Sequence, residues 1–107
     1  MNSSPEISVV LSTCPVDRAE ELAQKLVEGR LAACVNIVPS VTSVYRWEGK
    51  IEKDSEALLI VKCPSAGLDR LKSSLIGFHP YDVPEIVALP VVDGNPSYLD
   101  WVIAETS

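Results

Sequence analysis

The sequence lacks several features that common protein classes require. Its longest wholly apolar runs, Leu31 to Val35 and Ala57 to Val61, have five residues each, whereas a membrane-spanning helix needs about 20. Nine Lys and Arg residues stand against fifteen Asp and Glu residues, which gives a net charge of −6. This balance disfavours nucleic acid and anionic membranes as partners, because basic side chains supply most of that affinity. The stretch Met1 to Glu6 has no basic residue and no apolar run, so we expect no signal peptide and a cytoplasmic location.

Residues suited to catalysis are also scarce. The cysteines Cys14, Cys34 and Cys63 are odd in number and show no C-x-x-C spacing, which disfavours a disulfide framework or a four-thiolate zinc site. We expect them to be small buried hydrophobes on strands. His79 is the only histidine, and phosphate-loop and nucleophile-elbow motifs are absent. The sequence therefore predicts a protein that is not an enzyme.

What the chain does contain is the composition of one globular domain. It has 107 residues, 47% of them hydrophobic and 22% charged, so we expect a single domain spanning 1–107. β-Branched and apolar runs predict strands, and apolar residues at helical spacing predict helices. The predicted strands span 7–14, 31–47, 51–63 and 85–92, and the predicted helices lie between Asp17 and Gly29, between Ser65 and Gly77, and from Asn95 to Ala104. The order β-α-β-β-α-β plus a terminal helix predicts an α+β, ferredoxin-like fold, with one antiparallel sheet and helices on one face.

Particular residues are expected at the helix ends. Asp17, followed three residues later by Glu20, resembles a capping box at the start of the first helix. Gly29 is placed to end that helix in the left-handed conformation. Ser65 and Asn95 are expected to cap the second and third helices.

The central hairpin is long. Its arms, 31–47 and 51–63, are joined by a turn at 48–50, and each is about twice the usual strand length. Pro39 removes one donor from the ladder, so its arm must bulge, break or lie at an edge. A four-stranded sheet cannot cover such arms, and an exposed apolar ribbon is a liability in a monomer. We therefore expect a closed homo-oligomer. The predicted interface residues are Val44, Trp47, Ile51 and Trp101.

Four polar side chains are candidates for a site. His79 could act as a metal ligand or proton carrier, or it could be a half-buried loop side chain that bonds a backbone carbonyl. Glu85 precedes a strand that we expect to be buried, so it is either a ligand-binding carboxylate or an internal brace. Glu56 has the same two possible roles, a ligand-binding carboxylate or an internal brace. Lys62 is a candidate partner for either carboxylate or for an anionic ligand.

Aromatic side chains could stack a ligand, although packing in the core or at an interface is their usual role. An RNA-binding sheet is disfavoured, because the central strands lack the interleaved aromatic and basic residues that it needs.

Five segments spread over nearly the whole chain form a recognisable series. They are Leu-Ala-Ala-Cys at 31–34, Ser-Val-Tyr-Arg-Trp-Glu-Gly-Lys at 43–50, the stretch 56–62, His-Pro-Tyr-Asp-Val-Pro-Glu-Ile at 79–86, and Gly94 with Tyr-Leu-Asp-Trp at 98–101. In this order and spacing they resemble the CutA family, the divalent-cation tolerance proteins. The resemblance implies a cytoplasmic homotrimer of ferredoxin-like subunits, related in architecture to the PII signalling proteins, with long hairpins that pair between subunits.

The resemblance also implies a copper site, which has been proposed for some members of the family. In this chain Ser12 occupies the position of the expected Cys and Phe78 that of the expected His, whereas Glu85 is unchanged. A substitute set of Cys14, His79 and Glu85 would combine thiolate, imidazole and carboxylate, which bind copper and zinc ions.

Three functions follow as hypotheses. The first is a trimeric, non-enzymatic protein of the metal response that binds Cu(II) or another divalent cation weakly. The second is a PII-like small-molecule sensor, with an inter-subunit pocket formed by Lys62, Tyr45, Tyr81 and Glu56. The third is a structural or anchoring trimer.

Overall fold

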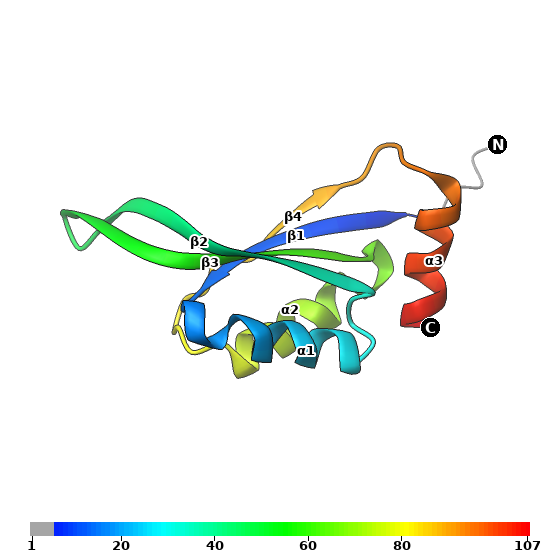
Figure 1. Cartoon of the computed structure of the whole chain (residues 1–107), viewed down its shortest axis with the longest axis horizontal. Helices are drawn as coiled ribbons and strands as arrows, with labels where there is room; N and C mark the ends of the chain where they lie inside the picture. Colours follow the sequence, from blue (N-terminus) through cyan, green and yellow to red (C-terminus); the bar gives the residue numbers. More distant parts are fainter. Residues whose placement is uncertain (1–5) are drawn as a thin grey trace.

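The computed structural model describes residues 6–107, so residues 1–5 of the predicted domain lie outside the described part. Its four strands, β1 (Ile7–Cys14), β2 (Cys34–Trp47), β3 (Lys50–Pro64) and β4 (Val87–Pro90), form one antiparallel sheet in the order β2-β3-β1-β4. Helices α1 (Ala19–Glu28) and α2 (Leu68–Phe78) cover one face, and α3 (Pro96–Thr106) lies at one end of the sheet (Figure 1). The predicted α+β, ferredoxin-like fold with an extra C-terminal helix is confirmed. No helix within residues 6–107 is long and apolar enough to cross a membrane.

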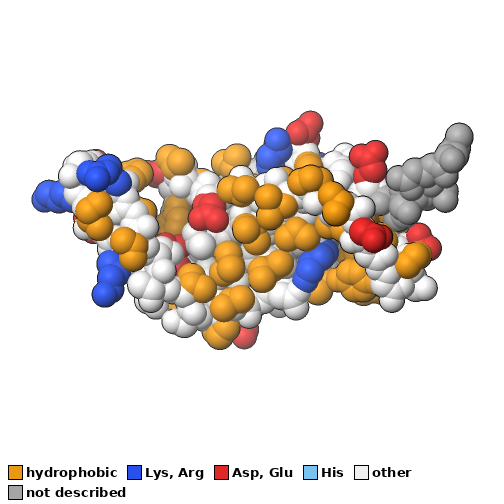
Figure 2. All heavy atoms as spheres, turned by 90° about the horizontal axis from the view of Figure 1, so that it is seen from above, with side chains coloured by type: hydrophobic (Ala, Val, Ile, Leu, Met, Phe, Trp, Pro, Cys, Tyr) orange, Lys and Arg blue, Asp and Glu red, His pale blue; other side chains and the backbone are white. Residues whose placement is uncertain are grey.

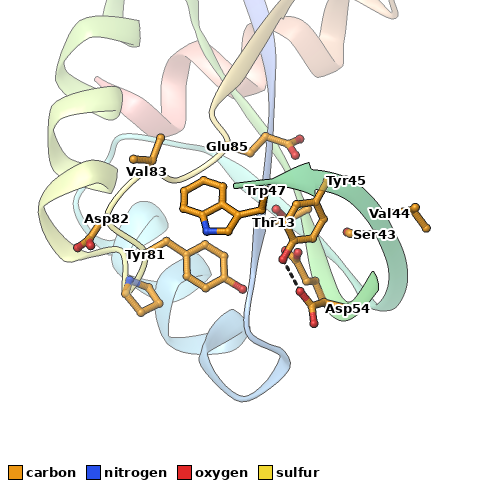
Figure 3. A pocket seen from close by; sticks show the side chains of 12 residues that line it. Thr13, Ser43, Val44, Tyr45, Trp47, Asp54, Tyr81, Asp82, Val83 and Glu85 are labelled. Atoms are coloured by element: carbon orange, nitrogen blue, oxygen red, sulfur yellow. Dashed lines mark hydrogen bonds between the residues drawn. The ribbon is translucent and has the colours of Figure 1, made fainter. Parts of the chain in front are cut away.

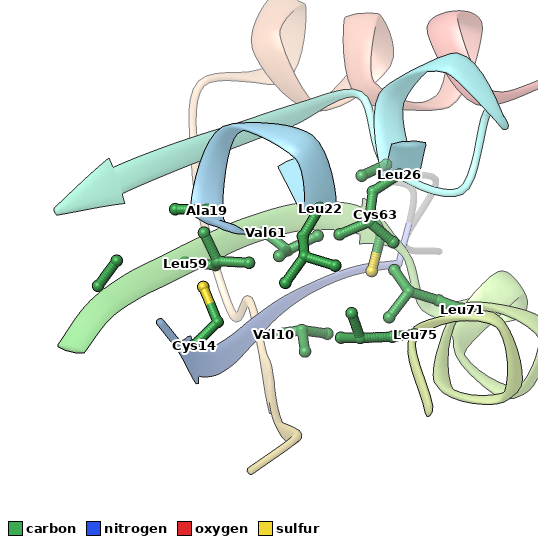
Figure 4. Packing of buried hydrophobic residues seen from close by; sticks show 12 residues of the cluster. Val10, Cys14, Ala19, Leu22, Leu26, Leu59, Val61, Cys63, Leu71 and Leu75 are labelled. Carbon is green, nitrogen blue, oxygen red and sulfur yellow. The ribbon is translucent and has the colours of Figure 1, made fainter. Parts of the chain in front are cut away.

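The main core lies between the sheet and the two covering helices. Alternate residues of β1 and β3 point toward α1 and α2, among them Val10 and Leu59, which are fully buried. Leucines of the two helices meet them (Figure 4). Burying one such side chain contributes roughly 1.5–3 kcal/mol, so this face supplies much of the hydrophobic stabilisation. The fully buried leucines of the helices are Leu22, Leu26, Leu71 and Leu75.

The opposite face of the sheet, which we call the open face, is apolar but is not covered by α1 or α2. Figure 2, a view from the side away from these helices, shows hydrophobic side chains gathered over the middle of the molecule. The apolar residues of this face include the half-buried Val9, Leu11, Val38, Leu58 and Ile60 and the exposed Val87 and Leu89. The prediction of a buried fourth strand over 85–92 is therefore wrong for the single chain. The strand spans only Val87–Pro90 and is exposed at all four positions, because it is an edge strand with β1 as its one neighbour.

The hairpin projects from the body as predicted. β1 pairs only with residues 57–64 of β3, so residues 41–47 and 50–56 pair only with each other and form what we call the ribbon. The molecule measures 50 × 26 × 23 Å, and the ribbon extends along its long axis (Figure 1). A register shift between Val38 and Val41 places a bulge at Pro39 on the edge strand β2, as expected. The predicted interface residues are well exposed: Val44 64%, Trp47 55%, Ile51 64% and Trp101 43%.

Two predicted helix caps are wrong, for a shared reason. Asp17 and Ser65 each lie in a 3-10 turn, Val16–Arg18 or Ser65–Gly67, that follows a proline and precedes the α-helix. α1 and α2 thus begin later, without a side-chain cap. The amide of Arg18 donates to the carbonyl of Pro15 over 3.0 Å, so the 3-10 turn satisfies a donor that a capping side chain would otherwise take up.

The end of α1 also differs from expectation by one residue. Gly29 has a φ of −78°, whereas Arg30 adopts the left-handed conformation with a φ of 58°. The amide of Leu31 donates to the carbonyl of Leu26 over 3.0 Å, and the amide of Arg30 donates to the carbonyl of Val27 over 3.1 Å. These two bonds form a Schellman motif in which Gly29 is the last residue of the helical turn. The third cap is as predicted, because the side chain of Asn95 accepts from the amide of Ser97.

Candidate functional site

A cleft of ≈ 930 Å³ lies where the ribbon leaves the sheet. One wall is the ribbon, from Ser43 to Trp47 and from Asp54 to Glu56, and the opposite wall is the loop 80–85 that follows α2. Thr13, near the end of β1, also lines it, and Figure 3 shows these segments around the cleft. The cleft therefore depends on the ribbon being longer than the rest of the sheet.

The cleft is acidic. Four carboxylate residues line it, Asp54, Glu56, Asp82 and Glu85, and no Lys, Arg or His is among its lining residues. Glu56 is only 7% exposed, and its Oε2 atom has no hydrogen-bond partner within residues 6–107. A buried carboxylate oxygen without a donor is costly. The arrangement therefore favours a cation in the cleft, and above all one that can reach Glu56.

Aromatic rings form much of the remaining wall. The hydroxyl of Tyr45 donates to Oδ2 of Asp54 (Figure 3), and this bond raises the pKa of Tyr45 to about 12. Burial, and then the charge of Glu56, raise the pKa of Tyr81. Both hydroxyls thus stay protonated at neutral pH. Trp47 lines the cleft farther out along the ribbon.

His79 holds the loop rather than lining the cleft. Its Nδ1 accepts from the amide of Tyr81 over 3.0 Å, so Nε2 carries the proton and donates to the carbonyl of Thr13, also over 3.0 Å. The side chain is 8% exposed, and burial lowers its pKa. Of the two readings of His79, the structure shows the side chain that bonds a backbone carbonyl. It fixes the loop to β1 and thereby positions Tyr81.

The substitute copper ligands are not brought together within one chain. Among residues 6–107, no three His, Cys, Asp or Glu side chains lie where they could hold a metal ion. Cys14 is fully buried in the core, and burial, followed by the charge of Glu56, raises the pKa of its thiol. Both nitrogens of His79 are already engaged, and Glu85 is exposed on the loop before β4. The residues present therefore do not fit a tight copper site.

The structure brings together three of the four predicted pocket residues. Tyr45, Tyr81 and Glu56 line the cleft, but Lys62 does not. Lys62 pairs with Val9 and lies six residues farther along β3 than Glu56, about 20 Å at the usual rise of a strand. Sequence reasoning missed Asp54, although the alternation of Glu52, Asp54 and Glu56 places three acidic side chains on one face of β3.

Cys34 and Cys63 lie outside the cleft lining. Cys63 is fully buried, and its thiol donates to the carbonyl of Ser8. Burial raises the pKa of Cys63 to about 11. Cys34, at the start of β2, is only half-buried. The expectation of buried cysteines on strands is thus confirmed for Cys14 and Cys63 and only partly met by Cys34.

Known proteins share both the sequence and the fold. Residues 8–105 match the family described as CutA1 divalent ion tolerance protein. The divalent-cation tolerance protein CutA of Thermus thermophilus is 52% identical over 99 residues, which cover 92% of this chain and 96% of that protein. Protein CutA of Mus musculus is 50% identical over 97 residues, which cover 90% of this chain but 55% of the mouse protein, so the chain spans about half the length of that relative.

The solved structure of CutA1 from Oryza sativa superposes with a TM-score of 0.94 at 43% identity, covering 99% of this chain and 98% of that one. The names of relatives include "chloroplastic" in Oryza and "periplasmic" in Archaeoglobus, so the cytoplasmic location stays a prediction. Sequence and fold agree over nearly the whole length. The chain belongs to the CutA1 divalent ion tolerance family.

Proposed function

We propose that this chain acts in divalent-cation tolerance as a homotrimer, and that it binds cations weakly in the acidic cleft. The observation that carries the proposal is the buried carboxylate of Glu56, whose Oε2 has no hydrogen-bond donor within residues 6–107 and which lines the cleft with three further acidic residues. The role is binding rather than catalysis. The cleft offers hydroxyl groups, but the one histidine is engaged on both ring nitrogens and is not among its lining residues.

Two apolar surfaces support the assembly. The open face of the sheet and the ribbon both expose hydrophobic side chains, including Val44 and Ile51 at 64% each, and such surfaces are usually covered by further copies. Three copies are what the family resemblance implies. Light scattering should report a particle of about three times the 11.6 kDa chain mass. Val44→Glu combined with Ile51→Glu should reduce that mass. A wild-type particle of one chain that stays folded would contradict the proposal.

The metal affinity should be low and should depend on carboxylates. Oxygen ligands without imidazole or thiolate suit hard divalent cations, and the weakest calcium sites built from such ligands bind at roughly 0.1–1 mM. Isothermal titration with Zn(II), Mg(II) and Cu(II) should give weak binding that Glu56→Gln and Glu85→Gln reduce. Asp100→Asn, an exposed change on α3, is the matched control. No heat at millimolar metal, or equal curves for all four proteins, would rule out direct binding.

A second candidate is a PII-like sensor of a small molecule. The size of the cleft, ≈ 930 Å³, lies at the upper end of the range for small-molecule sites, and three aromatic rings line it. A thermal-shift screen of anions, neutral molecules and organic cations tests this role. A flat response to every class would speak against it.

A further inference from the structure

We propose that the cleft binds an organic cation with N–H donors, of the alkylammonium or alkylguanidinium class. The inference rests on the proposed role of the cleft as a cation site, and it goes further by naming the class of ligand.

The first observation in favour of an organic cation is the buried carboxylate of Glu56. An ionised carboxylate is only an acceptor, so Oε2 of Glu56, buried and without a donor among the described residues, requires a hydrogen-bond donor. An N–H cation supplies that donor and the opposite charge in a single charge-assisted bond. A bare metal ion would need several converging ligands, and no group of three potential ligands lies in place within residues 6–107.

The second observation is that aromatic side chains line the cleft beside Glu56. Tyr45 and Tyr81 line the same cleft as Glu56 and expose 39% and 37% of their surface. The charge of Glu56 contributes to the raised pKa of both hydroxyls, so both rings lie within its electrostatic reach. Aromatic faces attract ammonium and guanidinium groups, and a planar guanidinium can also stack on them. A metal ion surrounded by water would gain little from these rings.

The remaining charges exclude the opposite class of ligand. Asp54 is engaged by Tyr45, and Asp82 and Glu85 add negative charge to the same wall. No Lys or Arg is among the residues that line the cleft, and Lys62 lies far along β3. Phosphates, nucleotides and carboxylates would therefore meet like charge without a cation to hold them. Val83 extends the wall with apolar surface that an alkyl chain can contact.

The test compares two nearly isosteric probes on the full chain in its native assembly. Butylguanidinium carries a charge, whereas butylurea has a similar shape and N–H groups but none. In an NMR titration of the labelled protein, butylguanidinium should shift the amide signals of residues 13, 45, 54–56, 81–83 and 85, and the shifts should saturate. Butylurea should bind about tenfold or more weakly, the ratio expected when a charge-assisted bond is lost. Equal binding of the two probes overturns the proposal without any variant.

Substitutions of single residues test which side chains bind butylguanidinium. Glu56→Gln should weaken butylguanidinium by about tenfold or more. Tyr81→Leu should weaken it about two- to fivefold, as expected for one cation–π contact, and Asp100→Asn should leave it unchanged. Unchanged binding by Glu56→Gln overturns the proposal. So does a loss of assembly in both Glu56→Gln and Lys62→Gln, because the carboxylate would then pair with a lysine of a neighbouring copy.

A Zn(II) titration of the same samples separates this inference from the proposed function. Zn(II) binding that Glu56→Gln reduces, with no response to butylguanidinium, would refute the organic cation and leave weak metal binding in place. No response to either cation would refute both. Saturable binding of butylguanidinium alone would support the organic cation against the metal.

Discussion

Removing the charge of Glu56 should stabilise the ligand-free protein. The change Glu56→Gln keeps the length and shape of the side chain but replaces a buried carboxylate whose Oε2 has no donor within residues 6–107. An unsatisfied buried polar group costs roughly 1–3 kcal/mol, and a charged one costs more, so removal of the charge should recover at least about 1 kcal/mol. For a domain of about 100 residues, each kcal/mol shifts Tm by roughly 4–8 °C. We therefore expect Tm to rise by at least about 4 °C.

The measurement is thermal and urea unfolding at pH 7. All proteins are compared at one chain concentration, because the apparent stability of an oligomer depends on it. Asp100→Asn removes an exposed carboxylate on α3 and should stay within about 0.5 kcal/mol of wild type. Glu56→Met tests whether an apolar side chain of similar length gives the same gain. If both changes at position 56 lower the stability, the carboxylate is partnered in the assembled protein, and the reasoning from an unsatisfied oxygen fails.

Two further predictions concern buried groups. Burial holds the pKa of His79 below its usual 6.5, so below that pH the unfolded chain binds more protons, and the free energy of unfolding should fall between pH 7.5 and 5.5. Urea titrations of His79→Gln should show a smaller fall over that interval; an equal fall would place the effect elsewhere. Native-state thiol labelling should modify at most one cysteine per chain, the half-buried Cys34, because Cys14 and Cys63 are fully buried and their thiol pKa values are raised. Labelling of two or more cysteines before unfolding would contradict the core packing described above.

Most of the fold could be predicted because its elements follow local rules. Residue alternation and helical spacing identified β1 and the two covering helices, and the length of the hairpin arms indicated a projecting ribbon. The helix starts could not be predicted in the same way. Asp17 and Ser65 are good capping residues in isolation, but the prolines before them start 3-10 turns that satisfy the backbone by another route. The exposure of β4 depends on which strands become neighbours, and no local pattern encodes that.

The site could be predicted only in part, since it depends on the register of strands distant in sequence. Tyr81 lines the same cleft as Glu56 because the loop after α2 is fixed to Thr13 by His79. Nothing in the sequence near either residue specifies that arrangement. Lys62 does not line the cleft of a single chain, because residues on the same face of one strand can lie too far apart to share a ligand. Its place in a pocket between subunits stays a prediction. Asp54 could have been found from the alternating acidic residues of β3.

The pairing of β1 with β3 also determines which side chains can reach the same cation. Cys14 is paired across the sheet with Ala57, the neighbour of Glu56, so the thiol and the carboxylate lie close along the strands. They belong to opposite faces, however, because Cys14 and Ala57 are both in the core and the next residue of a strand points the other way. The sheet thus separates the soft ligand from the hard one, and a single ion cannot be chelated by both. In the cleft, the lining residues offer a cation carboxylate and hydroxyl oxygen atoms and aromatic faces, which is the chemistry of weak metal association or of an organic cation.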